Sequence, residues 1–453
     1  MTKNIINVKI LKNLKLYLTT RVYASSRRQR MKKLIALILS LALSATLFAT
    51  LASCGKDNNS DTTVKYEWNT TEDSDGVVTL TSYSVSDAAK DLIADKKYEE
   101  LADGFTKNAP DGKKYDKDTV KTVTIPDNVN KIAAGAIDSL SFIEELVIGD
   151  NVTEIELGAF SNLSSLKKIT LPFTGNKLGA AGEKKLFGYI FGTASSSSLT
   201  SCTQTYNDGD SGNTATYYVP TTLEEVVITG TIKETSETFK VVEEDGKYII
   251  DEENGTEVKF VSEKESAVQP YAFYGITTIK NVTVKGNLIF ANTFNGCTAL
   301  QKVVINGENV EVRKSAFNGC TSLKNVTVNA DEAFKGIVTI GESAFDGCTA
   351  LGTSDSFSLG KLALPDATKI DASAFSGCSG IVTIVLKDGL NVEEALAEKA
   401  FNGCTSLIKV STGATVIIDT ADNQILEDST LGKIFSSCNS NLYKEVEKET
   451  NAE

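Results

Sequence analysis

The sequence predicts a β-rich repeat solenoid, with short strands and short helical turns in each coil, a small N-terminal cap and a β-meander insertion. Two observations carry this prediction. A nine-residue motif recurs along the second half of the chain, and a strand-like alternation of apolar residues follows its copies. Because a single coil of this kind cannot bury its own apolar side, the coils are expected to stack on one another.

The recurring motif is clearest at residues 315–323 (SAFNGCTSL) and 343–351 (SAFDGCTAL). Three further copies start at Asn292, Ser373 and Lys399, and a degenerate last copy spans residues 433–438. We expect the alanine to let neighbouring coils approach closely and the phenylalanine to fill the core. The phenylalanines of the five clear copies lie 23, 28, 30 and 26 residues apart and are Phe294, Phe317, Phe345, Phe375 and Phe401.

Apolar residues alternate after the motif, as in Leu323-x-x-Val326-x-Val328. This period of two is typical of a half-buried strand. A second short apolar segment precedes the phenylalanine, as at Ile337 and Ile340. One coil is therefore expected to run as strand, turn, strand and short helical turn.

These residues resemble BspA-type leucine-rich repeats. The resemblance rests on the Ala-Phe-x-x-Cys-x-x-Leu motif, on residues 125–136 (IPDNVNKIAAGA) and on residues 185–193 with their return at 218–223. It covers residues 120–440, and the motif intervals match the period of leucine-rich repeats. The resemblance implies a leucine-rich-repeat solenoid of surface or secreted proteins, which binds host proteins or other cells and supplies no catalytic residues.

Four segments depart from the repeat pattern. Residues 64–119 are expected to cap the first coil, with Ser86 as the N-cap of a helical stretch. Residues 174–219 are predicted to be a loop insertion. Residues 231–268 are predicted to be an acidic three-stranded β-meander, either a ligand-gripping arm or a decoration. Residues 441–453 form a polar tail.

The first 53 residues have the features of an export signal. They contain ten Lys or Arg and no Asp or Glu, and residues 34–52 form an apolar run that follows a second possible start at Met31. The run ends in Leu-Ala-Ser-Cys54, which resembles the lipobox of bacterial lipoproteins. We therefore expect lipid on Cys54, a flexible tether at residues 54–63 and anchoring to the outer face of a bacterial membrane. The alternative is an uncleaved membrane-spanning anchor.

Composition excludes several kinds of site. The chain has no histidine, which removes Ser-His-Asp and Cys-His catalysis and every His-ligated metal site. Its formal net charge of −13 argues against a nucleic-acid partner. Residues 207–213 lack the distal ligands of a calcium loop, so we expect no metal and no cofactor. One column of the repeat is predicted to hold buried thiols and contains Cys297, Cys320, Cys348, Cys378 and Cys404.

Side chains that point outward from the predicted strands are expected to form one long face, and solenoids use such faces for binding. Val227, Val304 and Val385 are the most interesting members, because aligned exposed apolar residues can form a patch. The candidate binding residues are Lys168, Thr170, Glu225, Val227, Lys302, Val304, Asn325, Thr327, Thr383 and Val385.

The predicted function is binding of an extracellular or host protein or a glycan at the cell surface, as in adhesion, without catalysis. The alternative is a structural lipoprotein that scaffolds an envelope complex. A third class, a hydrolase that uses paired carboxylates, has no motif to support it.

Overall fold

The computed structural model describes residues 62–109, 112–206, 212–244, 247–250, 256–263, 265–330, 332–353 and 360–444. These residues form two compact units, an insertion unit at Glu234–Ser262 and a solenoid unit that comprises the other described residues from Thr63 onward. No helix in the described ranges is long and apolar enough to cross a membrane. The predicted export signal, Cys54 and most of the tether and the C-terminal tail lie outside these ranges.

The N-terminal cap of the solenoid is a β-hairpin followed by two helices. Strands β1 (Tyr66–Glu72) and β2 (Val78–Val85) pair antiparallel, and helices α2 (Asp87–Ala94) and α3 (Tyr98–Asn108) follow. The single helical stretch expected here is divided at Lys96, whose φ is 57°. Ser86 precedes α2 as expected, but its hydroxyl accepts the Lys65 N–H and caps no helix N–H. The Tyr66 and Phe105 rings stack with centroids 4.3 Å apart, so hairpin and helices share one core.

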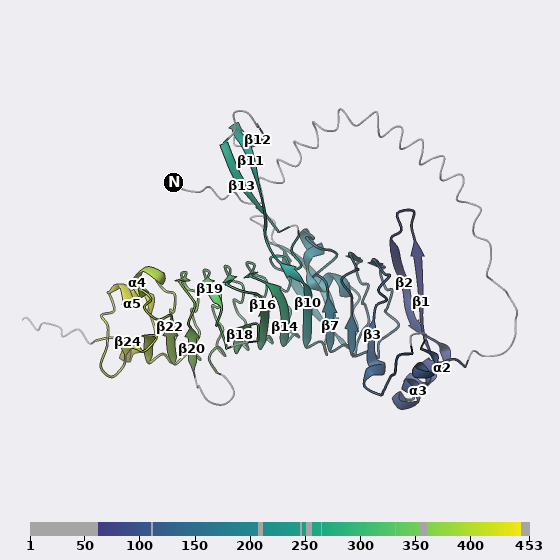
Figure 1. The fold of residues 1–453 in the computed structure, drawn as a ribbon. Coiled ribbons are helices and arrows are strands. Elements are labelled where there is room, and N and C mark those ends of the chain that lie inside the picture. The colour runs from purple at the N-terminus through teal and green to yellow at the C-terminus, as the bar shows by residue number, and fades with distance from the viewer. Residues whose placement is uncertain are drawn as a thin grey trace, which may run out of the picture. The chain divides into compact units, whose positions relative to one another are not determined.

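Each of seven coils contributes one strand to a parallel sheet, which we call the ladder sheet (Figure 1). A short helical turn, η2 (Thr119–Lys121), leads into its first strand. The strands in chain order are β3 (Thr122–Thr124), β5 (Glu145–Val147), β7 (Lys168–Leu171), β10 (Glu225–Ile232), β14 (Asn281–Gly286), β16 (Lys302–Asn306) and β18 (Asn325–Val328).

The second strand of each coil is shorter and lies in separate sheets. Strands β4 (Lys131–Ile132) and β6 (Glu154–Ile155) continue the hairpin in the order β1-β2-β4-β6. A parallel sheet of later coils consists of β15 (Leu288–Ile289), β17 (Val310–Val312), β19 (Ile337–Ile340) and β21 (Lys369–Ile370). The predicted leucine-rich-repeat solenoid is thereby confirmed.

The last coils form a sheet of their own, in the order β20-β22-β23-β24. The first three strands are parallel, and β24 closes the sheet as an antiparallel hairpin partner of β23. Helices α4 (Val392–Ala395), α5 (Thr430–Ile434) and η5 (Ser440–Leu442) complete this end. The four strands are β20 (Lys361–Leu364), β22 (Thr383–Leu386), β23 (Lys409–Thr412) and β24 (Thr415–Asp419).

From Phe273 onward the core contains a stack of phenylalanines, one from each coil. Neighbouring ring centroids lie 5.1–5.3 Å apart and neighbouring planes are within 15° of each other, from Phe273 to Phe435. All these rings are buried. Phe435 belongs to the degenerate copy, which is therefore a true coil. Stacked rings bury a large apolar area at each step, so every coil depends on its neighbours.

The predicted loop at residues 174–219 is an ordered part of the solenoid. It contains η3 (Gly182–Lys185), η4 (Phe187–Phe191) and a hairpin of β8 (Leu199–Tyr206) with β9 (Asn213–Pro220). The Phe187 ring lies 4.9 Å from that of Phe273, and Phe191 contacts Phe160. The buried Gln204 accepts the Gly188 N–H and donates to the Ala272 carbonyl. The insertion therefore continues the aromatic core, and the loop prediction was wrong because these contacts are remote in sequence.

The insertion unit has three antiparallel strands, β11 (Thr235–Glu244), β12 (Lys247–Ile250) and β13 (Thr256–Ser262). Their order is β12-β11-β13, so the central strand is the first and the sheet is not the meander that we predicted. The unit is also shorter than residues 231–268. Ser266, Ala267 and Val268 are buried in the solenoid unit, and the Ser266 hydroxyl donates to the Val268 carbonyl.

Candidate binding surface

The outward side of the ladder sheet, which we call the ladder face, has the predicted strand register. Val226 and Val303 point inward and are fully buried, and Ile384 does the same on β22 in the sheet of the last coils. Their neighbours Val227, Val304 and Val385 point outward and are half-buried. Because side chains alternate along a strand, this pattern fixes which residues a ligand could reach. The binding role of these residues stays a prediction.

Thr327 is the exception among the predicted face residues. Its side chain is only 6% exposed, so its placement on the exposed face was wrong. The cause is local, because residues after β18 fold back along it. Ala333 pairs antiparallel with Thr327, and the Phe334 N–H donates to the Val326 carbonyl. Asn325 remains half-buried on the same strand.

The remaining predicted residues divide between the two sheets. Thr383 and Val385 lie on β22, in the sheet of the last coils, and both are half-buried. Lys168, Thr170 and Glu225 lie on neighbouring strands of the ladder sheet, as does Val227. Lys302 and Val304 lie on β16. Within the ladder sheet the predicted residues thus lie on two pairs of neighbouring strands, and β14 between them carries none.

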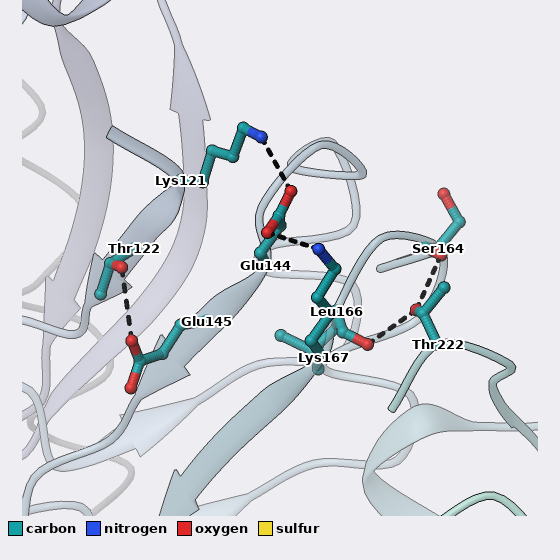
Figure 2. Close-up of polar contacts among 8 residues, drawn as sticks. All are labelled: Lys121, Thr122, Glu144, Glu145, Ser164, Leu166, Lys167 and Thr222. Carbon is teal, nitrogen blue, oxygen red and sulfur yellow. Dashed lines mark hydrogen bonds and ion pairs between the residues drawn. The ribbon is translucent and has the colours of Figure 1, made fainter. Parts of the chain in front are cut away.

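The N-terminal half of the ladder face carries ion pairs that run from strand to strand. Glu144 lies between two lysines and accepts hydrogen bonds from Lys121 and Lys167, both at 2.8 Å (Figure 2). One residue further on, Lys168 lies 3.4 Å from a carboxylate oxygen of Glu145 and 3.3 Å from one of Glu225. The hydrogen bonds from Lys121 and then Lys167 lower the pKa of Glu144.

A further ion pair, at 2.6 Å, joins Lys280 to Glu224. The four lysines and four glutamates of this half are therefore all paired. Only Lys168 and Glu225 were among the predicted residues. The others could have been found from the alternation of Lys and Glu at the position before each strand, which reads Lys121, Glu144, Lys167, Glu224 and Lys280.

Backbone contacts hold the strands in this register across the long insertion. The Thr222 hydroxyl donates to the carbonyls of Ser164 and Leu166, as Figure 2 shows. Ser164 is 58 positions and Leu166 is 56 positions earlier in the chain than Thr222. The coil that carries β10 therefore stacks on the coil of β7 as though the intervening residues were absent.

The column of cysteines is buried and forms no disulfide among the described residues. Each thiol from Cys297 to Cys438 donates to the carbonyl of the phenylalanine in the preceding coil, with sulfur to oxygen distances of 3.0–3.3 Å. Burial raises the pKa of the Cys320 and Cys378 thiols. The described residues contain no group of three or more side chains suited to a metal ion. Residues 207–211, most of the segment that we expected not to bind calcium, lie outside the described ranges.

Two open hollows lie beside the last coils, each of about 440 Å³. Thr368 and Lys387 line both, and Asp366 and Glu394 line one each. Ligand pockets that enclose small molecules are mostly apolar. These hollows are lined mainly by polar side chains and backbone turns, so they favour no particular small-molecule chemistry.

The sequence matches the family profile described as "BspA type Leucine rich repeat region", with six copies at residues 114–183, 246–355 and 333–445. A search of curated proteins found no match.

Solved structures of leucine-rich repeat proteins are similar. One from Bacteroides ovatus is 20% identical with a TM-score of 0.32, and the match covers 64% of this chain and 60% of that one. A leucine-rich cell surface protein from Faecalibacterium prausnitzii is 15% identical with a TM-score of 0.24, and the match covers 81% of this chain and 95% of that one. The pneumococcal vaccine antigen PcpA is 15% identical with a TM-score of 0.27, and the match covers 73% of this chain and 70% of that one. Likenesses this distant carry no argument about function.

Proposed function

Because the chain belongs to the BspA-type leucine-rich repeat family, we propose that it is a cell-surface lipoprotein whose ladder face binds an extracellular protein or glycan. The observation that supports binding most directly is the ladder face itself. It offers a regular array of outward side chains on stacked parallel strands, supported by a rigid stack of buried rings. Extended faces of this kind suit extended partners. The function involves no catalysis.

A triple substitution of Val227, Val304 and Val385 to Asp tests the ladder face together with the outward side of β22. These side chains are half-buried and point away from the core, so circular dichroism should remain that of the folded protein. Binding should weaken at least about tenfold, because charges replace apolar contacts at the interface. The measurement is capture on immobilised matrix proteins and glycans, compared with capture on solubilised envelope proteins. Loss of envelope capture alone would favour the scaffold alternative.

A deletion of Glu234–Ser262 is the matched control. Thr235 and Ser262 are paired neighbours on β11 and β13, so the two ends of the insertion unit lie close together and can be joined. Keeping Ser266 and Ala267 preserves the buried contacts of the solenoid. We expect this deletion to fold and to bind more strongly than the triple variant. A greater loss from the deletion would place the binding surface on the insertion unit.

Anchoring is tested by Cys54→Ala. If Cys54 is the lipidated residue, this variant should incorporate no labelled palmitate and should leave the membrane fraction, since a multiply acylated cysteine anchors firmly. A variant that is still labelled and membrane-bound would show that the anchor lies elsewhere.

A further inference from the structure

Lys168 and Lys302 occupy equivalent positions on the ladder face, but the first has acidic neighbours and the second has neutral ones. Lys168 on β7 is in register with Glu145 on one side and Glu225 on the other. Lys302 on β16 is in register with Asn281 and Asn325. The two glutamates neutralise Lys168, whereas neutral amides flank Lys302. Among the described residues Lys302 forms no ion pair, and its side chain is exposed.

A second lysine near Lys302 is also exposed and has neutral neighbours. Lys285, at the far end of β14, is exposed and is in register with Asn306 on β16 and Thr231 on β10. It also has no ion-pair partner in the described ranges. Strands β14, β16 and β18 contain no acidic residue. This is a local excess of positive charge on a chain whose formal net charge is −13.

The same strands carry side-chain amides that are not fully buried. Asn325 on β18 is half-buried next to Lys302. Asn281 and Asn306 are exposed beside the two lysines. Amides next to an ammonium group can donate to the same anion, and such charge-assisted hydrogen bonds are stronger than neutral ones.

The composition and spacing of β14, β16 and β18 distinguish between a protein partner and an extended chain. Protein partners concentrate their binding energy on buried Trp, Tyr and Arg. Strands β14, β16 and β18 contain none of these, and their central outward residues Thr283 and Val304 are short. Neighbouring strands are about 4.8 Å apart, so a chain lying across them meets Asn281, Lys302 and Asn325 at regular steps.

We propose that β14, β16 and β18 bind a polysaccharide that carries carboxylates, with Lys285 and Lys302 pairing with its carboxylates and the flanking asparagines hydrogen-bonding its polar groups. The inference rests on the proposed function, since it names the ligand class of the same ladder face. The paired half of the face, from β3 to β10, then serves as a neutral support, because its lysines are already satisfied.

The experiment measures binding of the full chain to polygalacturonate, to its fully methyl-esterified form and to poly-glutamate. The ester keeps the backbone and removes the charge. The test variant is Lys285→Gln with Lys302→Gln. The matched control is Lys121→Gln with Lys167→Gln, which removes the same charge from two lysines of the same face that are paired with Glu144.

We expect polygalacturonate to bind, the ester to bind at least about tenfold more weakly, and the test variant to lose at least about tenfold. The control should stay within about twofold, and added salt should weaken binding. Failure of polygalacturonate to bind, equal losses in the two variants, or tighter binding of poly-glutamate would each overturn the proposal. If any of these occurs while the triple valine variant still loses an extracellular ligand, the proposed function stands and only the ligand class is wrong.

Discussion

The two halves of the solenoid are held together in different ways. From β3 to β10 the rings are irregular, with Phe160 and Phe191 edge to face at 70°, while the ladder face is joined by ion pairs. From Phe273 to Phe435 the rings of the repeat motif are stacked, the thiols hydrogen-bond to the preceding coil, and Lys285 and Lys302 form no ion pair among the described residues. Because exposed ion pairs contribute little to stability, a solenoid with a regular core can leave the lysines of its surface to a partner.

The largest expected effect concerns the core of the two halves. Phe345→Ala should lower the free energy of unfolding by about 3–5 kcal/mol. Phe160→Ala should cost about 1 kcal/mol less, because Phe345 stacks on both Phe317 and Phe375 whereas Phe160 has one edge contact with Phe191. Chemical denaturation measures both values. Equal losses would mean that ring stacking does not distinguish the two halves.

A smaller effect concerns the charges. The folded-state pKa of Glu144 is depressed, so its stabilisation is present above the unfolded pKa of about 4.3 and is lost as pH falls through the folded value. Glu144→Gln should therefore destabilise the protein by about 0.5–1 kcal/mol at pH 7 and by less at acidic pH.

Lys302→Gln is the matched change in the other half and should alter stability by less than about 0.5 kcal/mol at either pH. Denaturation at two pH values, with carboxyl resonances followed by NMR, makes the comparison. A normal pKa for Glu144 would contradict the paired character of the N-terminal half.

The smallest effect concerns the last coil. Ser437 has a φ of 55° at the position where the preceding coils have Gly377 and Gly403, at 68° and 72°. Glycine adopts positive φ without the steric cost of a Cβ. Ser437→Gly should stabilise the protein by about 0.5 kcal/mol, and Gly347→Ser should have the opposite sign. Thermal unfolding of both variants is the measurement, and destabilisation by Ser437→Gly would show that its hydroxyl has another role.

Much of the fold could be predicted from the sequence, because a solenoid repeats its local pattern in its tertiary structure. The positions of Phe317 and Phe345, the register of Val226 and Val303 and the buried column of thiols all follow from one coil stacking on an identical coil. The errors lie where the repeat is interrupted. Residues 174–219 and the order of β11, β12 and β13 depend on contacts that no repeat specifies.

The candidate surface shows the same division. The sequence by itself determined which residues face outward, since side chains alternate along a strand whose inward positions are apolar. Only the tertiary structure decided that Lys168 is neutralised and Lys302 is not, because their neighbours are 21 or more residues away and meet them through the register of stacked coils. It also decided that Thr327 is covered, since Ala333 folds back onto β18. Charge pairing and burial are determined by how the coils stack, whereas the direction of a side chain is determined by its own strand.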